Sequence, residues 1–222
     1  MSRPRPRTLP AQPGRLPVRA ALLVAGSVVS TVCYAVTIRS HLGLGPLFAV
    51  QDGLAHHAGI TIGHAVMIVG IALIGLAVLV RNPPGIGTVL LPFIGGATLD
   101  ALLPHVPVIH GWAIRGIAVV AASWIMGLGG AIVIRAAIGV SALDAVMLGL
   151  QRTLGWSLVA VRLGMETAML LGGWALGGAV GVGTVITGLL IGPSMHYWLR
   201  VLRATPAAPV SPRSPGTAPA LR

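Results

Sequence analysis

The chain has 222 residues, of which 55% are hydrophobic and only 9% are charged, and its mean hydropathy is +0.90. Soluble domains carry about 25% charged residues, so this composition excludes an ordinary water-soluble fold. The net charge is +11, its positive part comes from 15 Arg residues alone, and many of these lie before the first and after the last apolar run. That placement is typical of the flanks of membrane spans, and no motif for binding nucleic acid accompanies it.

The two ends of the chain differ from its middle. Residues 1–19 are rich in Arg and Pro and residues 204–222 in Pro, and we expect both to be disordered tails because neither has an apolar face to bury. Between them we expect two three-helix membrane units, residues 20–110 and 111–203.

Six apolar runs are long enough to span a bilayer, because one crossing needs about 20 residues. Two shorter segments, residues 47–58 and 143–154, predict short re-entrant, interfacial or bundle-packed helices. The sequence therefore predicts an all-α, polytopic membrane bundle. A cleaved signal peptide is the alternative for the first run, but a full-length counterpart later in the chain favours a retained helix. The runs are residues 20–38, 60–80, 86–103, 116–134, 156–176 and 182–199.

The sequence matches itself without gaps when it is shifted by 96 residues. The matching positions are rich in Gly and include an Arg pair, which predicts a duplication. Because each copy holds three spans, the copies must cross the membrane in opposite senses, as in the inverted repeats of many transporters. The matches include Arg39 with Arg135, Gly43 with Gly139, Gly85, Gly87 and Thr88 with Gly181, Gly183 and Thr184, and Gly96 with Gly192.

Short segments interrupted by glycine at matching positions of the two halves indicate the binding site in such folds. Here these segments begin at Gly43, Gly45 and Pro46 in the first half and at Gly139 in the second. Broken helices expose backbone groups that only protein or a polar cavity can satisfy inside a membrane. The Gly-x-Gly-Thr motifs follow no strand, so we interpret them as close helix packing rather than dinucleotide binding.

The distribution of Arg predicts the orientation. With the N-terminus inside, the cytoplasmic face receives both tails, Arg81, Arg135 and Arg152, whereas the outer face receives only Arg39 and Arg115. The positive-inside rule therefore places both termini in the cytoplasm.

The glycine motifs resemble those of the YczE/YyaS-like bacterial membrane proteins. The resemblance covers about residues 20–200 and rests on the segments at 43–46, 53–54, 59–63, 84–88, 181–185 and 190–193. It implies a helical membrane fold in the inner membrane of a bacterial cell and names no substrate. The family usually has an acid after its Gly-x-Gly-Pro turn. Here Phe48 stands at that place in the first half, whereas Asp144 keeps it in the second.

Three aspartates, Asp52, Asp100 and Asp144, lie in apolar surroundings. A carboxylate in mid-membrane costs about 3 kcal/mol, so it should face the bundle interior or water, be paired, or be protonated. Each is a candidate for a proton or cation relay or for substrate contact. The alternative is a carboxylate near the headgroups or one that bonds a broken helix end, and capping is a strong alternative for Asp144.

Arg162 and Glu166 are four residues apart within the fifth span and can neutralise each other on one helix face. They are either a buried functional pair or a pair near the membrane surface. Arg39 and Arg135 are expected to be anchors at helix ends, with contact to an anion or a headgroup as the alternative.

The chain shows no catalytic constellation, metal-ligand spacing or nucleotide-binding motif. We therefore expect a membrane protein that is not an enzyme and needs no metal or cofactor. The favoured function is a small transporter or permease for a small molecule or ion. A non-transporting accessory or scaffold subunit with a membrane-protein partner, and the substrate-binding subunit of an energy-coupled importer, are the alternatives.

Overall fold

The computed structural model describes residues 16–202; residues 1–15 and 203–222, which include most of the two expected tails, lie outside the described part. The described chain is all-helical, as predicted. Its elements are α1 (Leu16–Ser40), α2 (Pro46–Ala58), α3 (Ile62–Leu79), α4 (Ile86–Leu102), the 3-10 helix η1 (Leu103–His105), α5 (Trp112–Ala136), α6 (Ala142–Leu154), α7 (Leu158–Ala175) and α8 (Val182–Val201).

Five of these helices are long and apolar enough to cross a membrane: α1, α3, α4 with η1, α5 and α7. The sixth expected span corresponds to α8, which has sufficient length but is less apolar, because Ser194, His196 and Arg200 lie in its second half. Large apolar side chains such as Leu79, Ile86 and Ile117 are more than two-thirds exposed, which suits a surface that faces lipid.

The expectation of a disordered tail as far as residue 19 is wrong for its last four residues. Helix α1 begins at Leu16. Pro17 falls in the first turn, where its missing N–H breaks no intrahelical bond. Arg19, two residues further on, donates from Nε to the carbonyl of Ala136 at 2.9 Å and ties this start to the end of α5.

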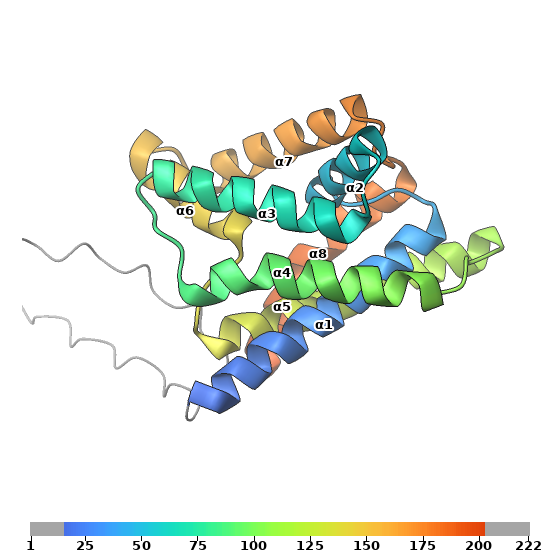
Figure 1. Cartoon of the computed structure of the whole chain (residues 1–222), viewed down its shortest axis with the longest axis horizontal. Coiled ribbons are helices and arrows are strands. Elements are labelled where there is room, and N and C mark those ends of the chain that lie inside the picture. The colour runs from blue at the N-terminus through green and yellow to red at the C-terminus, as the bar shows by residue number, and fades with distance from the viewer. Residues whose placement is uncertain (1–15, 203–222) are drawn as a thin grey trace, which may run out of the picture.

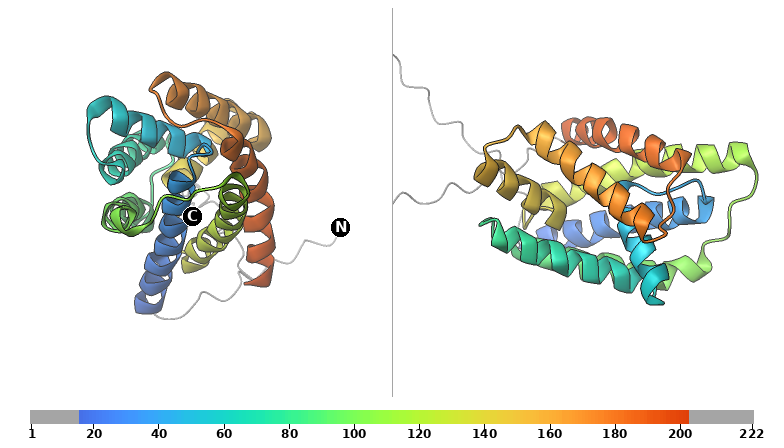
Figure 2. Two further views of the ribbon diagram at one scale, coloured as in Figure 1. Left: turned by 90° about the vertical axis from the view of Figure 1, so that its right-hand side faces the viewer. Right: turned by 90° about the horizontal axis from the view of Figure 1, so that it is seen from above.

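The long helices alternate in direction along the longest axis of the molecule (Figure 1). At one end, which we call the terminal end, the start of α1 meets the end of α5, and Arg135 of α5 donates to the carbonyl of Leu202 after α8 at 3.0 Å. At the opposite end, Arg39 of α1 donates to the carbonyl of Leu103 at 2.5 Å. The short helices α2 and α6 lie toward the opposite and terminal ends respectively (Figures 1 and 2).

The centre of the bundle is the crossing of α1 and α5. Gly26 of α1 lies against the backbone of Gly129, and a Cβ at Gly129 would in turn overlap Ser30. Small residues let two membrane helices approach closely, where van der Waals contact rather than the hydrophobic effect holds them together. This crossing joins the first helix of one half to the first helix of the other.

The helix bounds recur at the spacing of the sequence matches. Adding 96 to the bounds of α1, α2 and α3 gives those of α5, α6 and α7, and α4 and α8 also begin 96 residues apart. The short helices end alike, because Gly59 and Gly155 adopt left-handed φ values of 64° and 70°. Glycine takes this conformation without the steric cost that a Cβ would add.

The two halves differ in how their last two long helices pack. In the first half α3 lies directly on α4, with Gly63 against Gly96 and Gly70 against Pro92. The second half has no comparable contact between α7 and α8. There Gly188 and Gly192 of α8 have open space where a Cβ would point, and Leu163 of α7 is 59% exposed. The last two long helices of the first half are thus closed on each other, whereas those of the second half stand apart.

Candidate functional site

The loop between α1 and α2 is held by the start of α8, a helix of the other half. The carbonyl of Leu42 accepts from the N–H of Gly183 at 2.7 Å, and the N–H of Leu44 donates to Ala179 at 2.8 Å. Gly43 lies between them with φ +106°, and its α-carbon faces the backbone of Gly181 so closely that a Cβ would overlap it. The glycine at 43 and the glycines at 181 and 183 therefore allow the same close contact between two backbone segments.

The loop between α5 and α6 makes the corresponding contact with the start of α4. The N–H of Gly87 points at the carbonyl of Ile138 at 3.4 Å, and Thr88 donates from Oγ1 to the carbonyl of Val140 at 2.6 Å. A Cβ at Gly139 would lie 2.7 Å from the backbone N of Thr88, and one at Gly85 would lie 2.8 Å from the carbonyl of Ile138. Each half thus places its broken loop on the last helix of the other half.

The remaining motif residues begin helices. Pro46 stands in the first turn of α2 with Gly45 as its N-cap, where a proline needs no donor. Thr184 accepts the N–H of Gly181 on its Oγ1 at 3.1 Å at the start of α8. Phe48, which replaces the family's usual acid, stacks on the ring of Tyr34 at 4.0 Å between centroids. The residue at this place in the first half therefore contributes to apolar packing and carries no charge.

Asp52 is nearly fully buried on α2 and is bonded to the backbone of the other half. Its Oδ2 accepts from the N–H of Ala179 at 2.9 Å, in the loop between α7 and α8. His56, one turn later, lies 3.5 Å from Oδ1, although its side chain is two-thirds exposed. The carboxylate satisfies a backbone donor that the interrupted chain leaves free.

Asp144 lies in the first turn of α6 and is bonded to Ser141, the residue that caps this helix. Ser141 accepts the N–H of Asp144 at 3.1 Å, and its hydroxyl donates to the Asp144 carboxylate at 2.7 Å. Burial raises the pKa of Asp144, while the Ser141 hydrogen bond and the positive charge of Arg162 act in the lowering direction. The spacing Ser-x-x-Asp at residues 141–144 is the sequence signal for such a cap. Helix α6 is too short to cross a bilayer.

Arg162 and Glu166 form the ion pair that their spacing predicts, with 2.9 Å between Nε and Oε1. The pair lies on α7, and the two side chains are 51% and 36% exposed. Gly70, the first-half counterpart of Glu166, is sealed against Pro92, whereas Gly188, which corresponds to Pro92, has nothing close to it. The ion pair therefore lies on α7 at the position where, in the first half, the corresponding residue of α3 packs against α4.

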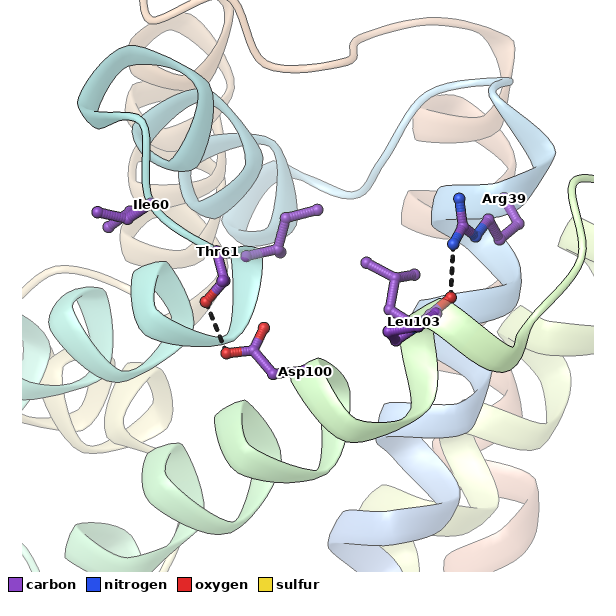
Figure 3. A pocket seen from close by; sticks show the side chains of 7 residues that line it. Arg39, Ile60, Thr61, Asp100 and Leu103 are labelled. Carbon is purple, nitrogen blue, oxygen red and sulfur yellow. Dashed lines mark hydrogen bonds between the residues drawn. The ribbon is translucent and has the colours of Figure 1, made fainter.

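Arg39 and Asp100 line one cavity at the opposite end of the bundle, with a volume of about 470 Å³ (Figure 3). Thr61, Leu103 and three other residues complete its wall. Asp100 accepts from the hydroxyl of Thr61 at 2.6 Å and from the N–H of Gly63 at 2.8 Å, so that it also caps the start of α3. Thr61 and Gly63 carry no local sequence signal for this role, because their partner is 39 or 37 positions away.

The hydrogen-bond donors of Arg39 are only partly used by the protein. Its Nη2 donates to the carbonyl of Leu103, while its Nε is buried without a hydrogen-bond partner. No carboxylate of the described residues lies within 4 Å of it. Its counterpart Arg135 donates to the carbonyl of Leu202 instead.

No group of three potential metal-ligating His, Cys, Asp or Glu side chains gathers anywhere in residues 16–202. A second hollow, of about 560 Å³, lies on the outer face of α5 and is lined by Gly116, Ile117, Trp124 and other apolar residues. Such a lining suits an acyl chain of the surrounding lipid.

The fold and its apolar surface define a polytopic helical membrane protein. The chain belongs to a family of unknown function (DUF6198), which it matches over residues 17–200. It is 28% identical over 208 residues to the uncharacterized membrane protein YczE of Bacillus subtilis, with 89% of this chain and 97% of the relative covered. It is 26% identical over 176 residues to an uncharacterized protein of Haemophilus influenzae, with 78% and 79% covered. No solved structure matches the chain.

Proposed function

We propose that this protein is a small secondary transporter or permease, built as a 3+3 inverted repeat, and that it is not an enzyme. The proposal is supported by the helix directions in Figure 1, where α1, α3 and α4 run opposite to α5, α7 and α8 respectively, and by the contact of each broken loop with the other half. Transporters of this design bind their substrate where the two repeats meet and expose it to the two sides of the membrane in turn.

The observation that carries the proposal is the difference between the halves. The two halves pack differently, with α3 closed on α4 and α7 apart from α8. If the halves exchange these conformations, the site becomes open to the other side of the membrane. Such an exchange is the expected form of alternating access in an inverted repeat.

The exchange predicts a contact that is absent here. In the closed half Thr61 bonds Asp100 across α3 and α4. The residues 96 positions later are Ser157 and His196, on the two sides of the open half. In the exchanged state they should face each other as Thr61 and Asp100 do now.

Cysteine cross-linking in native membranes tests this contact. In a Cys33→Ala background, we expect the pair Ser157→Cys/His196→Cys to form a disulfide upon oxidation. The pair Thr61→Cys/Asp100→Cys is the matched control and should cross-link readily, since its side chains already touch. Free thiols are counted from the gel shift caused by a maleimide polymer. If the control pair reacts fully and the 157/196 pair never reacts, the halves do not exchange, and a static accessory or scaffold subunit becomes the better account.

We further propose that the protein lies in the bacterial inner membrane with its terminal end in the cytoplasm. Arg19, Arg81 and Arg135 lie at or near that end, where they are joined by Arg152 and Arg200. Within residues 16–202 the opposite end holds only Arg39 and Arg115, as the positive-inside rule favours for an outer face.

Reporter fusions test the orientation. Alkaline phosphatase fused after Arg81 or at the C-terminus should be inactive, while green fluorescent protein at these points should fluoresce, because both lie inside. A phosphatase fusion after His110, in the loop between η1 and α5, should be active. Phosphatase activity at Arg81 or at the C-terminus would reverse the topology.

A further inference from the structure

Three polar side chains, Thr61, His64 and Asp100, fasten the start of α3 to α4. Asp100 of α4 accepts from the hydroxyl of Thr61 at 2.6 Å (Figure 3) and from the N–H of Gly63 at 2.8 Å. Nδ1 of His64 lies 3.3 Å from Oδ2 of the same carboxylate. The imidazole is therefore a further link between the two helices, beside the close contact of Gly63 with Gly96.

The hydrogens of this cluster can be counted at the hydroxyl of Thr61. The hydroxyl donates to Asp100, accepts from the backbone N–H of His64 at 3.2 Å, and lies 2.5 Å from Nδ1 of the His64 ring. A hydroxyl has one hydrogen, and Thr61 uses it on the carboxylate, so Nδ1 must carry a hydrogen to bond here. The neutral ring has a hydrogen on only one of its nitrogens, whereas the imidazolium has one on both. A second proton on His64 therefore fixes this hydrogen and adds a positive charge beside Asp100.

The cluster is open to water. The side chains of His64 and Asp100 are 65% and 25% exposed. Imidazole is the side chain that ordinarily gains its charge between about pH 8 and about pH 5. Because the cluster lies at the opposite end of the bundle, the orientation proposed above places it in contact with protons outside the cell.

Asp100 is the carboxylate that faces His64. No other carboxylate of residues 16–202 lies within 4 Å of the ring. Arg39 stands on the far side of the cavity, with Leu103 between it and Asp100 (Figure 3). The other titratable or charged side chains on η1 and on the short helices packed against α3 are His105 of η1, Asp52, His56 and His57 of α2, and Asp144 and Arg152 of α6. His105 bonds the carbonyl of Ala101, and His56 lies against Asp52.

We propose that His64 and Asp100 form a proton-binding site on the outer face of the protein, and that a proton bound there holds α3 closed on α4. The inference rests on the transporter function proposed above and adds its regulation. The stabilisation is present while the imidazole is protonated and is lost as the pH rises and the proton leaves. A falling external pH therefore favours the closed first half, and a rising pH favours the exchange.

This control acts from one side of the membrane. The second-half counterparts of His64 and Asp100 are Ala160 and His196, so closure of α7 on α8 would form no such pair. The proton is not carried across, because both groups belong to the outer ends of their helices. The pH outside the cell, rather than inside, should therefore set the balance between the two arrangements.

A double-mutant cycle tests the proposal, with reversible unfolding in mixed detergent micelles as the measurement. The cycle compares the unchanged chain, His64→Ala, Asp100→Asn and the double variant. His64 is exposed, and Asn still presents an oxygen to the N–H of Gly63, so the fold is kept. At about pH 5.5, where imidazole is protonated, the two residues should be coupled by about two- to fivefold in the unfolding equilibrium constant, as for a partly exposed ion pair. At about pH 8 the coupling should vanish.

His57→Ala is the matched control. His57 is also exposed, and no carboxylate of residues 16–202 lies within 4 Å of it, so its cycle with Asp100→Asn should show no coupling at either pH. The proposal is overturned if His64 and Asp100 are uncoupled at the lower pH, if their coupling is the same at both pH values, or if His57 gives the same result.

The cycle requires no exchange between the halves. Coupling at the lower pH without the 157/196 cross-link would therefore remove the transporter function and leave the proton site. The cross-link without coupling would remove only the proton site.

Discussion

Gly43→Ala is expected to destabilise the protein by several kcal/mol. At φ +106° an L-residue is strained by about 1–3 kcal/mol. The new Cβ would also overlap the backbone of Gly181, which is not a flexible side chain, and such overpacking costs about 1–3 kcal/mol more. The change should separate the first broken loop from α8. Reversible unfolding in mixed detergent micelles measures the loss.

Gly59→Ala is the matched control for this prediction. Gly59 also has a positive φ, of 64°, but a Cβ there would meet nothing within 4 Å. Its replacement should therefore cost only the left-handed strain, about 1–2 kcal/mol. Equal losses for the two variants would mean that the contact between the loop and α8 contributes little, contrary to the packing described above.

Gly63→Ala should have the second large effect, because it separates α3 from α4. The added Cβ would overlap the carbonyl of Gly96 and the carboxyl of Asp100. Overpacking of this kind costs about 1–3 kcal/mol, and the hydrogen bond from Gly63 to Asp100 would be strained as well. We expect a lower midpoint in the same unfolding measurement.

Gly75→Ala, on the same helix, is the control for Gly63→Ala. A Cβ at Gly75 has nothing within 4 Å. Its replacement should be neutral or stabilising, by about 0.5–1 kcal/mol, because Gly weakens a helix interior relative to Ala. If Gly63→Ala is as harmless as Gly75→Ala, then α3 and α4 are not closed on each other.

The helices could be predicted from the sequence because uncharged runs end at strong local signals. Arg39, Arg81 with its following prolines, and Arg135 mark ends that the structure places within a few residues. The two short helices were predictable for the same reason, since each begins at a glycine-containing loop and ends at a glycine. The composition of residues 16–19, which include Pro17 and Arg19, did not indicate the first turn of α1, which a hydrogen bond to α5 holds.

The roles of the acidic residues were predictable only in part. The cap at Asp144 has a local signal, Ser141 three positions earlier. The partners of Asp52 and Asp100 are 127 and 37 to 39 residues away, and no local pattern indicates them. The carboxylates of Asp52 and Asp100 accept from backbone N–H groups at a loop and at a helix start, whereas that of Asp144 accepts from the hydroxyl of Ser141.

The difference between the halves also lay beyond the sequence. The matches at 96 residues predict two similar units, and only the packing shows that one is closed and the other open. Glu166 in place of Gly70 was visible as an asymmetry, but the sequence alone did not indicate that α8 would stand away from it.

The exchange of conformations is tested most directly by a substitution in the first half and a measurement of the separation between α7 and α8 in the second. Spin labels at Ala160→Cys and Tyr197→Cys, both exposed, report the separation of α7 and α8 by pulsed electron resonance in lipid nanodiscs. We predict that Gly63→Ala, which disfavours closure of α3 on α4, adds a short-distance component to this pair, and that Gly75→Ala does not. An identical distance distribution in the unchanged chain and in Gly63→Ala would contradict coupled halves.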